Sequence, residues 1–183
     1  MISRHIKQDL TRKQKITFLF GLIIFLAGFG ILSFLGIRRI SRDLHRSRLM
    51  RENTVIEIPD LHIKAPVLEG VEQSVLAEAA GHFPGKGSIG SGNYCIAAHS
   101  SVLYKEYFNN LKNARDGMEV MLYRQKSDRA VYRITEMKIV DPHEVSVLDD
   151  TGDDRVTLIT CTDDGTQRLV VTGMLQPDED SAA

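Results

Sequence analysis

The longest apolar run of the chain lies near its beginning, from Ile16 to Ile37. These 22 residues carry no charge, and only Thr17 and Ser33 have polar side chains. A helix of this length spans about 33 Å, enough to cross the hydrocarbon core of a bilayer. A cleaved signal peptide has a shorter apolar segment, and so uniformly apolar a helix does not suit the core of a small protein. The pattern predicts an uncleaved membrane anchor over residues 16–37, between a basic tail (1–15) and a basic linker (38–53).

From Thr54 onward the apolar positions form short runs typical of β-strands, separated by turn residues. One stretch, 72–80, has helical spacing, with Gly81 expected as its C-terminal cap. Another short helical turn is expected over 103–111, packing Tyr107 and Phe108. Many short strands with one or two short helices favour a closed β-barrel or a sandwich. The predicted strands are 54–58, 61–68 (an edge strand or broken at Pro66), 93–98, 118–123, 130–140, 155–162 and 169–172, with a glycine-rich loop over 84–92.

Charge divides the chain into two parts. Residues 1–51 carry a formal charge of +9, and the remaining 132 residues carry −10. An acidic domain without a basic stripe argues against nucleic acid as a partner. Six basic residues follow the apolar run and five precede it, so the positive-inside rule does not choose an orientation. The basic stretch after the anchor fits a helix along the membrane surface or a solvated linker equally well. The acidic end of the chain, 177–183, is expected to be a flexible tail.

The most distinctive chemistry lies in the segment Thr157-Leu-Ile-Thr-Cys161, which is followed seven residues later by Arg168. If Asp164-Gly165 forms a two-residue hairpin turn, Cys161 lies directly opposite Arg168; a three-residue loop would instead oppose Cys161 to Gln167. A neighbouring cation favours the thiolate, the nucleophilic form of cysteine, and an arginine can also hold an oxyanion. Equally, Cys161 could be a buried structural cysteine beside a solvated arginine.

This cysteine box with its downstream arginine resembles the active-site signature of the sortases, the membrane-anchored cysteine transpeptidases of Gram-positive bacteria. The segment Gly92-Asn-Tyr-Cys-Ile-Ala-Ala-His99 resembles the strand that carries the histidine of the family, although many relatives have glycine where this chain has Ala98. Weaker similarity covers Ala80–Pro84, Phe108–Leu111 and Asp116-Gly117. The resemblance extends from about Val55 to Leu175 and implies a sortase-type closed β-barrel as a catalytic domain over residues 54–176.

The resemblance also implies a function and a location. Cys161 is expected to attack the Thr–Gly bond of a Leu-Pro-x-Thr-Gly-like sorting signal, His99 to act as general acid and base, and Arg168 to stabilise the oxyanion. Thr160 is expected to add a substrate contact. The partners implied are secreted proteins with a C-terminal sorting signal and an amine of a cell-wall precursor or a pilin. The catalytic domain is expected outside the cell, on a single-pass anchor, in a class A-like or accessory sortase.

Three further expectations concern other polar residues. His82 is expected to make a structural hydrogen bond to backbone, leaving His99 as the catalytic histidine by its match to the family. Cys95 lies four residues before His99, about 13 Å along a strand, so it is expected to be a reduced core residue and not a disulfide partner of Cys161. No metal or cofactor is expected: calcium is possible through the carboxylates of 141–154 but is not favoured, since such runs are usually solvated loops.

Two other functions stay open on the sequence. A hydrolytic cysteine protease on the same scaffold would release the acyl group to water instead of an amine. A non-catalytic, membrane-tethered β-barrel binding module would use Cys161 only as a structural residue.

Overall fold

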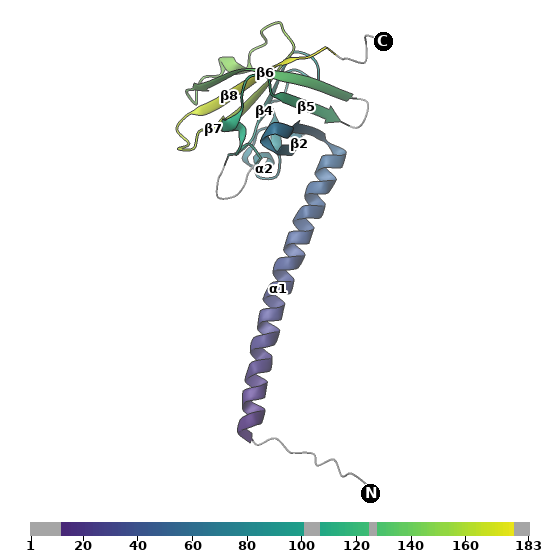
Figure 1. The fold of residues 1–183 in the computed structure, drawn as a ribbon, viewed down its shortest axis with the longest axis vertical. Helices are drawn as coiled ribbons and strands as arrows, with labels where there is room; N and C mark the ends of the chain where they lie inside the picture. Colours follow the sequence, from purple (N-terminus) through teal and green to yellow (C-terminus); the bar gives the residue numbers. More distant parts are fainter. Residues whose placement is uncertain (1–11, 101–106, 125–127, 178–183) are drawn as a thin grey trace. The chain divides into compact units, whose positions relative to one another are not determined.

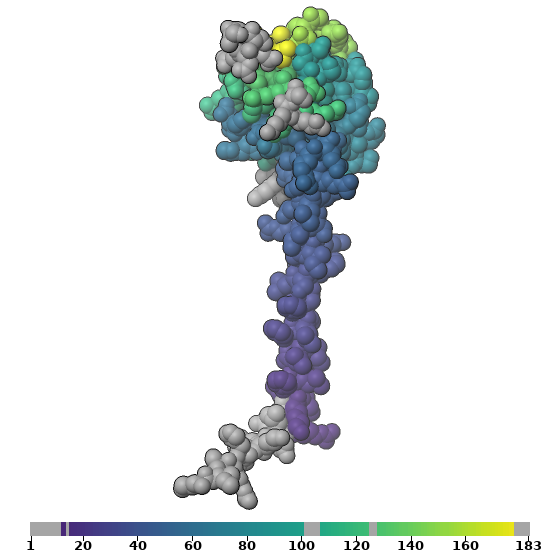
Figure 2. Space-filling view, turned by 90° about the vertical axis from the view of Figure 1, so that its right-hand side faces the viewer, coloured from purple at the N-terminus to yellow at the C-terminus, as the bar shows by residue number. Residues whose placement is uncertain are grey.

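The computed structural model describes residues 12–100, 107–124 and 128–177. It divides into two compact units, Met1–His45 and Arg46–Ala183. The first contains most of helix α1 (Arg12–Glu52), which is 41 residues long. Its large apolar side chains are exposed from Ile16 to Ile40, and Figure 2 draws this helix in purple to blue.

Helix α1 is long and apolar enough to cross a membrane by its length and composition. The basic stretch that follows the apolar run continues the same helix as far as Glu52. Its location along the membrane surface stays a prediction. The division of residues 1–53 into a tail, an anchor and a linker stays a prediction.

The second unit is a closed, mainly β barrel, as predicted (Figure 1). Around the barrel the strands follow the order β1-β2-β3-β4-β7-β8-β6-β5, and β5 pairs with β1 to close it. All neighbours are antiparallel except the pairs β2–β3 and β4–β7, which are parallel. The strands are β1 (Thr54–Ile58), β2 (Ile63–Glu69), β3 (Ala80–His82), β4 (Asn93–Ala97), β5 (Glu119–Arg124), β6 (Asp128–Val140), β7 (Arg155–Cys161) and β8 (Arg168–Leu175).

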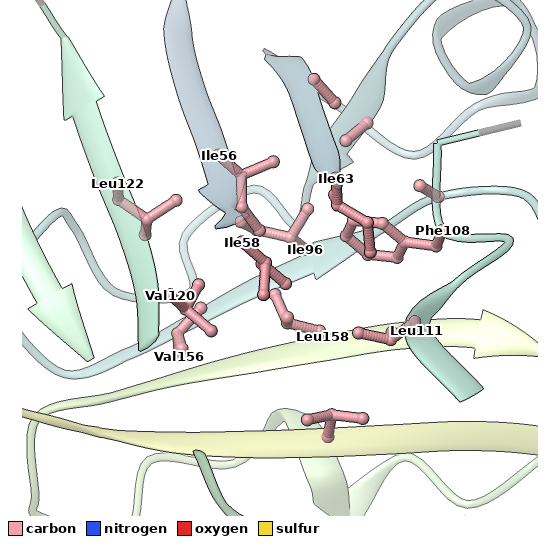
Figure 3. Close-up of a cluster of buried hydrophobic side chains, with 14 of the residues drawn as sticks. Ile56, Ile58, Ile63, Ile96, Phe108, Leu111, Val120, Leu122, Val156 and Leu158 are labelled. Carbon is pink, nitrogen blue, oxygen red and sulfur yellow. The ribbon is translucent and has the colours of Figure 1, made fainter. Parts of the chain in front are cut away.

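Short helices occupy the connections: α2 (Gln73–Leu76) and the 3₁₀ helices η1 (Pro59–Leu61), η2 (Leu111–Asn113) and η3 (Ser146–Leu148). The inward side chains of the strands form one apolar core, in which Ile56, Ile96 and Leu158 are fully buried (Figure 3). The segment before η2 contributes Phe108 and Leu111 to the same core, both without exposed surface. The expectation that Phe108 packs inward is confirmed, whereas residues 103–106 of the expected helical turn lie outside the described residues.

The structure corrects the predicted helix over 72–80. Helix α2 has only four residues, and Gly81 belongs to strand β3, where it pairs with Ala97 of β4. A Cβ atom on Gly81 would lie 2.2 Å from the carbonyl oxygen of Gly70. Glycine is needed here because two backbones approach closely and not because a helix ends, and the sequence pattern does not distinguish these two uses.

Pro66 lies inside strand β2 without breaking it. It pairs with Val55 of β1, while the parallel ladder from β2 to β3 begins only at Val67. On that side β2 is locally an edge strand at Pro66, so the missing N–H interrupts no ladder.

Candidate active site

The hairpin of β7 and β8 brings Cys161 and Arg168 together. The two residues end the ladder as direct partners, so their side chains leave the sheet on the same face. Both are half-buried, and Arg168 Nη1 donates a hydrogen bond of 3.1 Å to the carbonyl oxygen of Gln167. The predicted register is confirmed, and the alternative pairing of Cys161 with Gln167 is excluded.

The turn of this hairpin differs from the predicted one. The Gly165 N–H donates to the carbonyl oxygen of Thr162 at 2.8 Å, and the Thr162 N–H donates to Gln167 O at 3.1 Å. Four residues therefore separate Thr162 from Gln167, the last bonded pair, and Gly165 ends the turn at φ +72°. A four-residue loop keeps the same register as a two-residue loop since both are even, which explains why the Cys161–Arg168 pairing was right although the turn was wrong.

Asp164 stabilises this turn through its side chain. Its Oδ1 accepts hydrogen bonds from the Thr162 hydroxyl at 2.6 Å and the Thr166 N–H at 3.1 Å, and its Oδ2 accepts one from the Thr166 hydroxyl at 2.7 Å. Hydrogen bonds from Thr162 and Thr166 lower the pKa of Asp164 to about 2. The loop between the nucleophile candidate and the arginine is thus held by an ionised carboxylate at neutral pH.

Strand β4 lies on the other side of β7 and carries His99 just beyond its end. The parallel register pairs Cys95 with Thr157 and Ala97 with Ile159. Continuing this register by two residues puts His99 beside Cys161. The ladder does continue, because the Ala98 N–H donates to the carbonyl oxygen of Ile159 at 3.1 Å. The backbone at His99 therefore lies next to the end of β7 on one side, and Arg168 of β8 pairs with Cys161 on the other.

Two hydroxyl groups fasten the end of β4 to the end of β7. The Thr160 hydroxyl donates to the carbonyl oxygen of Ala98 at 2.8 Å, and the Ser100 hydroxyl donates to that of Cys161 at 2.9 Å. Thr160 is buried and faces the barrel interior, opposite Leu169, so its hydroxyl serves the strand junction. Its predicted contact with substrate stays a prediction.

Cys95 and His82 have the structural settings that the sequence suggested. Cys95 is a free, fully buried thiol, and burial raises its pKa to about 11. His82 is buried and stacks on Tyr94, its Nε2 donates to the carbonyl oxygen of Lys86 at 2.8 Å, and its Nδ1 lies 2.8 Å from Glu69 Oε2. Neither residue belongs to the neighbourhood of Cys161.

The connection from β6 to β7, residues 141–154, is anchored against β4. Buried Asn93 donates from Nδ2 to the carbonyl oxygens of Val147 and Asp149 at 3.1 and 2.9 Å. The Asn93 Oδ1 accepts from the Thr157 hydroxyl at 2.6 Å. These bonds hold the connection at the end of β4 and β7 that is remote from Cys161.

Several carboxylates of this connection each have their own hydrogen-bond or ion-pair partner. Asp154 accepts the Gly92 N–H at 2.8 Å, Asp153 pairs with Arg155, and Glu144 bonds Ser146. Among the described residues, no group of three or more His, Cys, Asp or Glu side chains is arranged to hold a metal ion. The expectation that no calcium or other cofactor is needed stays a prediction.

A pocket of about 420 Å³ opens beside Cys161, between the segment 108–112 and strands β6, β7 and β8. Its walls include Phe108, Met137, Ile139 and Leu169. At its rim, Lys112 Nζ lies 2.8 and 3.0 Å from the two carboxylate oxygens of Asp163.

Sequence reasoning missed Asn93, Ser100 and the Lys112–Asp163 ion pair. Each joins segments far apart in the chain, for example Lys112 and Asp163, which are 51 residues apart. No local pattern signals such contacts. The apolar residues Met137 and Ile139 lie within the strand that was predicted over 130–140, but their exposure at a pocket was not predicted.

Comparison with known proteins agrees with this geometry. A model of the sortase domain matches residues 56–176. Sortase A of Streptococcus agalactiae is 37% identical over 128 residues, covering 66% of this chain and 51% of that protein. Sortase A of Listeria monocytogenes is 31% identical over 126 residues, covering 68% of this chain and 56% of that protein. This chain therefore spans about half the length of these relatives.

Solved structures give the same result. A pilus-related sortase C of Group B Streptococcus is 32% identical with a TM-score of 0.63, covering 71% of this chain and 70% of that one. The sortase A structure of Listeria monocytogenes is 30% identical with a TM-score of 0.63, covering 69% of this chain and 88% of that one. With a family model over more than half of its length and a closed barrel of the same fold, the chain belongs to the sortase family.

Proposed function

We propose that this protein is a cysteine transpeptidase that transfers an acyl group from a sorting signal to an amine. The observation that supports the proposal is the register of the sheet: Arg168 of β8 pairs directly with Cys161, and His99 follows the end of β4, which pairs with β7 as far as Ile159. Cys161 is half-buried at a strand end, where a peptide can reach it, whereas Cys95 has no exposed surface.

In the first half-reaction, the Cys161 thiolate attacks the carbonyl carbon of the scissile peptide bond. A C–S bond forms, the C–N bond breaks, and His99 gives a proton to the leaving amine, which yields a thioacyl-enzyme. The guanidinium of Arg168 donates hydrogen bonds to the oxygen that becomes negative in the tetrahedral intermediate.

In the second half-reaction, an amine attacks the thioester carbonyl. A C–N bond forms, the C–S bond breaks, and His99 accepts the proton that the amine loses, so the enzyme returns to its starting state. Release of the acyl group to water instead would make the protein a hydrolytic protease.

Family membership supports the substrates of this proposal. The acyl donor is a secreted protein with a Leu-Pro-x-Thr-Gly-like signal, cleaved between Thr and Gly, and the acceptor is an amine of the cell wall or of a pilin. The relatives include both sortase A proteins and a pilus-related sortase C, so either acceptor is consistent with them. In this proposal α1 anchors the enzyme in the cell membrane, with the barrel outside.

The test uses the full chain in detergent with a fluorogenic peptide that contains Leu-Pro-x-Thr-Gly. Mass spectrometry would follow the products with and without an added amine. A transpeptidase gives the amide of the added amine at the Thr carbonyl, while a hydrolase gives only the free acid.

The two cysteines provide a matched pair of variants. Cys161→Ala should lose cleavage by about 10³-fold or more because the nucleophile is absent, whereas Cys95→Ala should keep it. Full cleavage by Cys161→Ala, or none by wild type on any sorting peptide, would reject the proposal and favour a binding module.

A further inference from the structure

The pocket beside Cys161 lies on the opposite side of the sheet from Arg168. Thr160 and Leu169 are partners in the β7–β8 ladder and face inward, while Cys161 and Arg168, one position along, face outward. On β6, Ile139 pairs with Leu169, so it shares the inward face. Cys161 ends its strand and therefore borders both faces.

This pocket is apolar and open. Its volume of about 420 Å³ falls within the usual range for small-molecule sites. In the described part of the barrel unit, the large apolar side chains that remain exposed are Met137, Ile139 and Val145. Two of these three, Met137 at 40% and Ile139 at 58% exposure, line the pocket. Exposed apolar surface gathered beside a nucleophile indicates a ligand that covers it.

The rim of the pocket already holds a primary ammonium group. Lys112 reaches Asp163 from the segment that forms one wall, and Asp163 is only two residues from Cys161. Both side chains are substantially exposed, 44% for Lys112 and 65% for Asp163, and exposed ion pairs contribute little stability. Another ammonium group could therefore replace Lys112 at Asp163 with little loss.

We propose that this pocket is the binding site of the acceptor, and that the acceptor it fits is a primary amine carried on an apolar stem. The stem packs against Met137 and Ile139, and Asp163 holds the ammonium group before it loses its proton. The inference rests on the proposed transpeptidase function and assigns its second substrate to the face that His99 and Arg168 do not line.

Separate faces suit the reaction. The acyl chain would occupy the outer face between His99 and Arg168, and the amine would approach the thioester carbon from the inner side past Asp163. The amine nitrogen then forms the C–N bond, the C–S bond breaks, and His99 accepts the proton, as in the second half-reaction. The donor and the acceptor would not compete for one site.

The test measures transfer to a series of alkyl amines from ethylamine to hexylamine, using the full chain in detergent and a sorting peptide. These amines have nearly the same basicity, so differences report binding of the stem. In wild type, kcat/KM for the amine should rise about three- to fourfold for each methylene group added until the pocket is filled. In Ile139→Asn this dependence on chain length should flatten.

Further variants separate the parts of the site. Met137→Gln should flatten the same dependence, which keeps the test decisive if Ile139→Asn folds poorly. Asp163→Asn should raise KM for every amine without changing the dependence on length. Arg133→Gln, on the same strand but outside the pocket, should behave as wild type, since it removes an exposed pair with Glu119 and a long hydrogen bond to Gly117.

The outcomes distinguish the two proposals. Transfer that does not depend on chain length in wild type, or a dependence that persists in both Ile139→Asn and Met137→Gln, would overturn the acceptor site while leaving the transpeptidase intact. Absence of any cleavage by wild type would overturn the transpeptidase, and the acceptor site with it.

Discussion

The two ends of the ladder β4–β7–β8 differ in how deeply side chains on the same face of the sheet are buried. At one end, which we call the covered end, Cys95 and Thr157 are both buried, and Asn93 anchors the connection 141–154. At the other end Cys161 is half-buried, with Arg168 opposite. The two cysteines share one face of the sheet, because Cys95 pairs with Thr157 and Cys161 lies four residues after Thr157 on the same strand.

This contrast shows that the residue type alone does not create a nucleophile. Burial raises the pKa of Cys95 to about 11, so at neutral pH its thiol is almost wholly protonated. Cys161 escapes this burial because its strand ends at that residue, and its partner on the neighbouring strand is Arg168. The position of each cysteine in the ladder therefore decides whether its thiol is buried, as in Cys95, or accessible, as in Cys161.

The largest effect within this comparison is expected for the two arginines at the ends of the β7–β8 ladder. Arg168→Gln should lower kcat for peptide cleavage by about 10²- to 10³-fold, because the oxyanion loses a charged donor. Arg155→Gln should keep kcat near the wild-type value, since Arg155 pairs with Asp153 at the covered end. Steady-state kinetics with thermal unfolding as a check on folding would measure both.

Arg168→Lys sharpens this test. A lysine keeps the charge but lacks the planar fork of donors, so we expect it to recover only part of the lost activity. Equal losses in Arg168→Gln and Arg155→Gln would mean that the arginines act through stability and not at the nucleophile.

The thiols themselves provide the next prediction. Burial raises the pKa of Cys95 from the ordinary value of 9.0 to about 11. The thiolate fraction of Cys95 at pH 7 is therefore about 100-fold lower than that of an ordinary cysteine. Alkylation of folded Cys95 by iodoacetamide should be slower than that of an exposed thiol by at least this factor. Peptide mapping after timed alkylation would show Cys161 modified first. Modification of both at one rate, in folded protein, would remove the contrast between the two ends.

The sequence predicted the register of the hairpin at Cys161 better than it predicted the surrounding elements. The Cys161–Arg168 pairing was correct because hairpin register depends only on short-range spacing, and the even loop length preserved it. His99 was selected by resemblance to the family, since residue type left it close to His82. The barrel followed from many short strands, but Gly81 was assigned to a helix cap because its real constraint, the carbonyl of Gly70, lies on another segment.

Non-local contacts account for the rest. Neither the hydrogen bonds of Asn93 nor the ion pair at the pocket rim has a local signature. Asn93 bonds Val147, 54 residues away, and Lys112 pairs with Asp163, 51 residues away. Such contacts depend on the closed barrel, which brings distant loops together only after folding.

Asn93 is expected to maintain the covered end. Asn93→Ala removes two donated hydrogen bonds and leaves the hydroxyl of Thr157 without its acceptor, which should lower the free energy of unfolding by about 2 kcal/mol. Loosening of the connection should also speed alkylation of Cys95 by about tenfold. Asn110→Ala, which removes one hydrogen bond to Leu61, serves as the control and should leave Cys95 protected. A destabilised Asn93→Ala with unchanged Cys95 alkylation would show that the strands and not the connection protect the thiol.

The smallest expected effect concerns two carboxylates, one at each end of the ladder. Hydrogen bonding from Arg155 and Thr151 lowers the pKa of Asp153 to about 2, and hydrogen bonding from Thr162 and Thr166 does the same for Asp164. Because both pKa values in the folded state lie below the value of about 3.9 in an unfolded chain, these contacts stabilise the fold above pH 4 and are lost as the pH falls toward 2.

Arg155→Gln separates the two carboxylates. It should raise the pKa of Asp153 toward its ordinary value of 3.8 while Asp164, which is held by threonines, keeps a pKa of about 2. Carboxyl carbon chemical shifts from pH 6 to pH 1.5 would give both midpoints in one titration. If the pKa of Asp164 rose together with that of Asp153, the two ends of the ladder would be electrostatically coupled. The turn beside Cys161 would then respond to charge changes at the covered end.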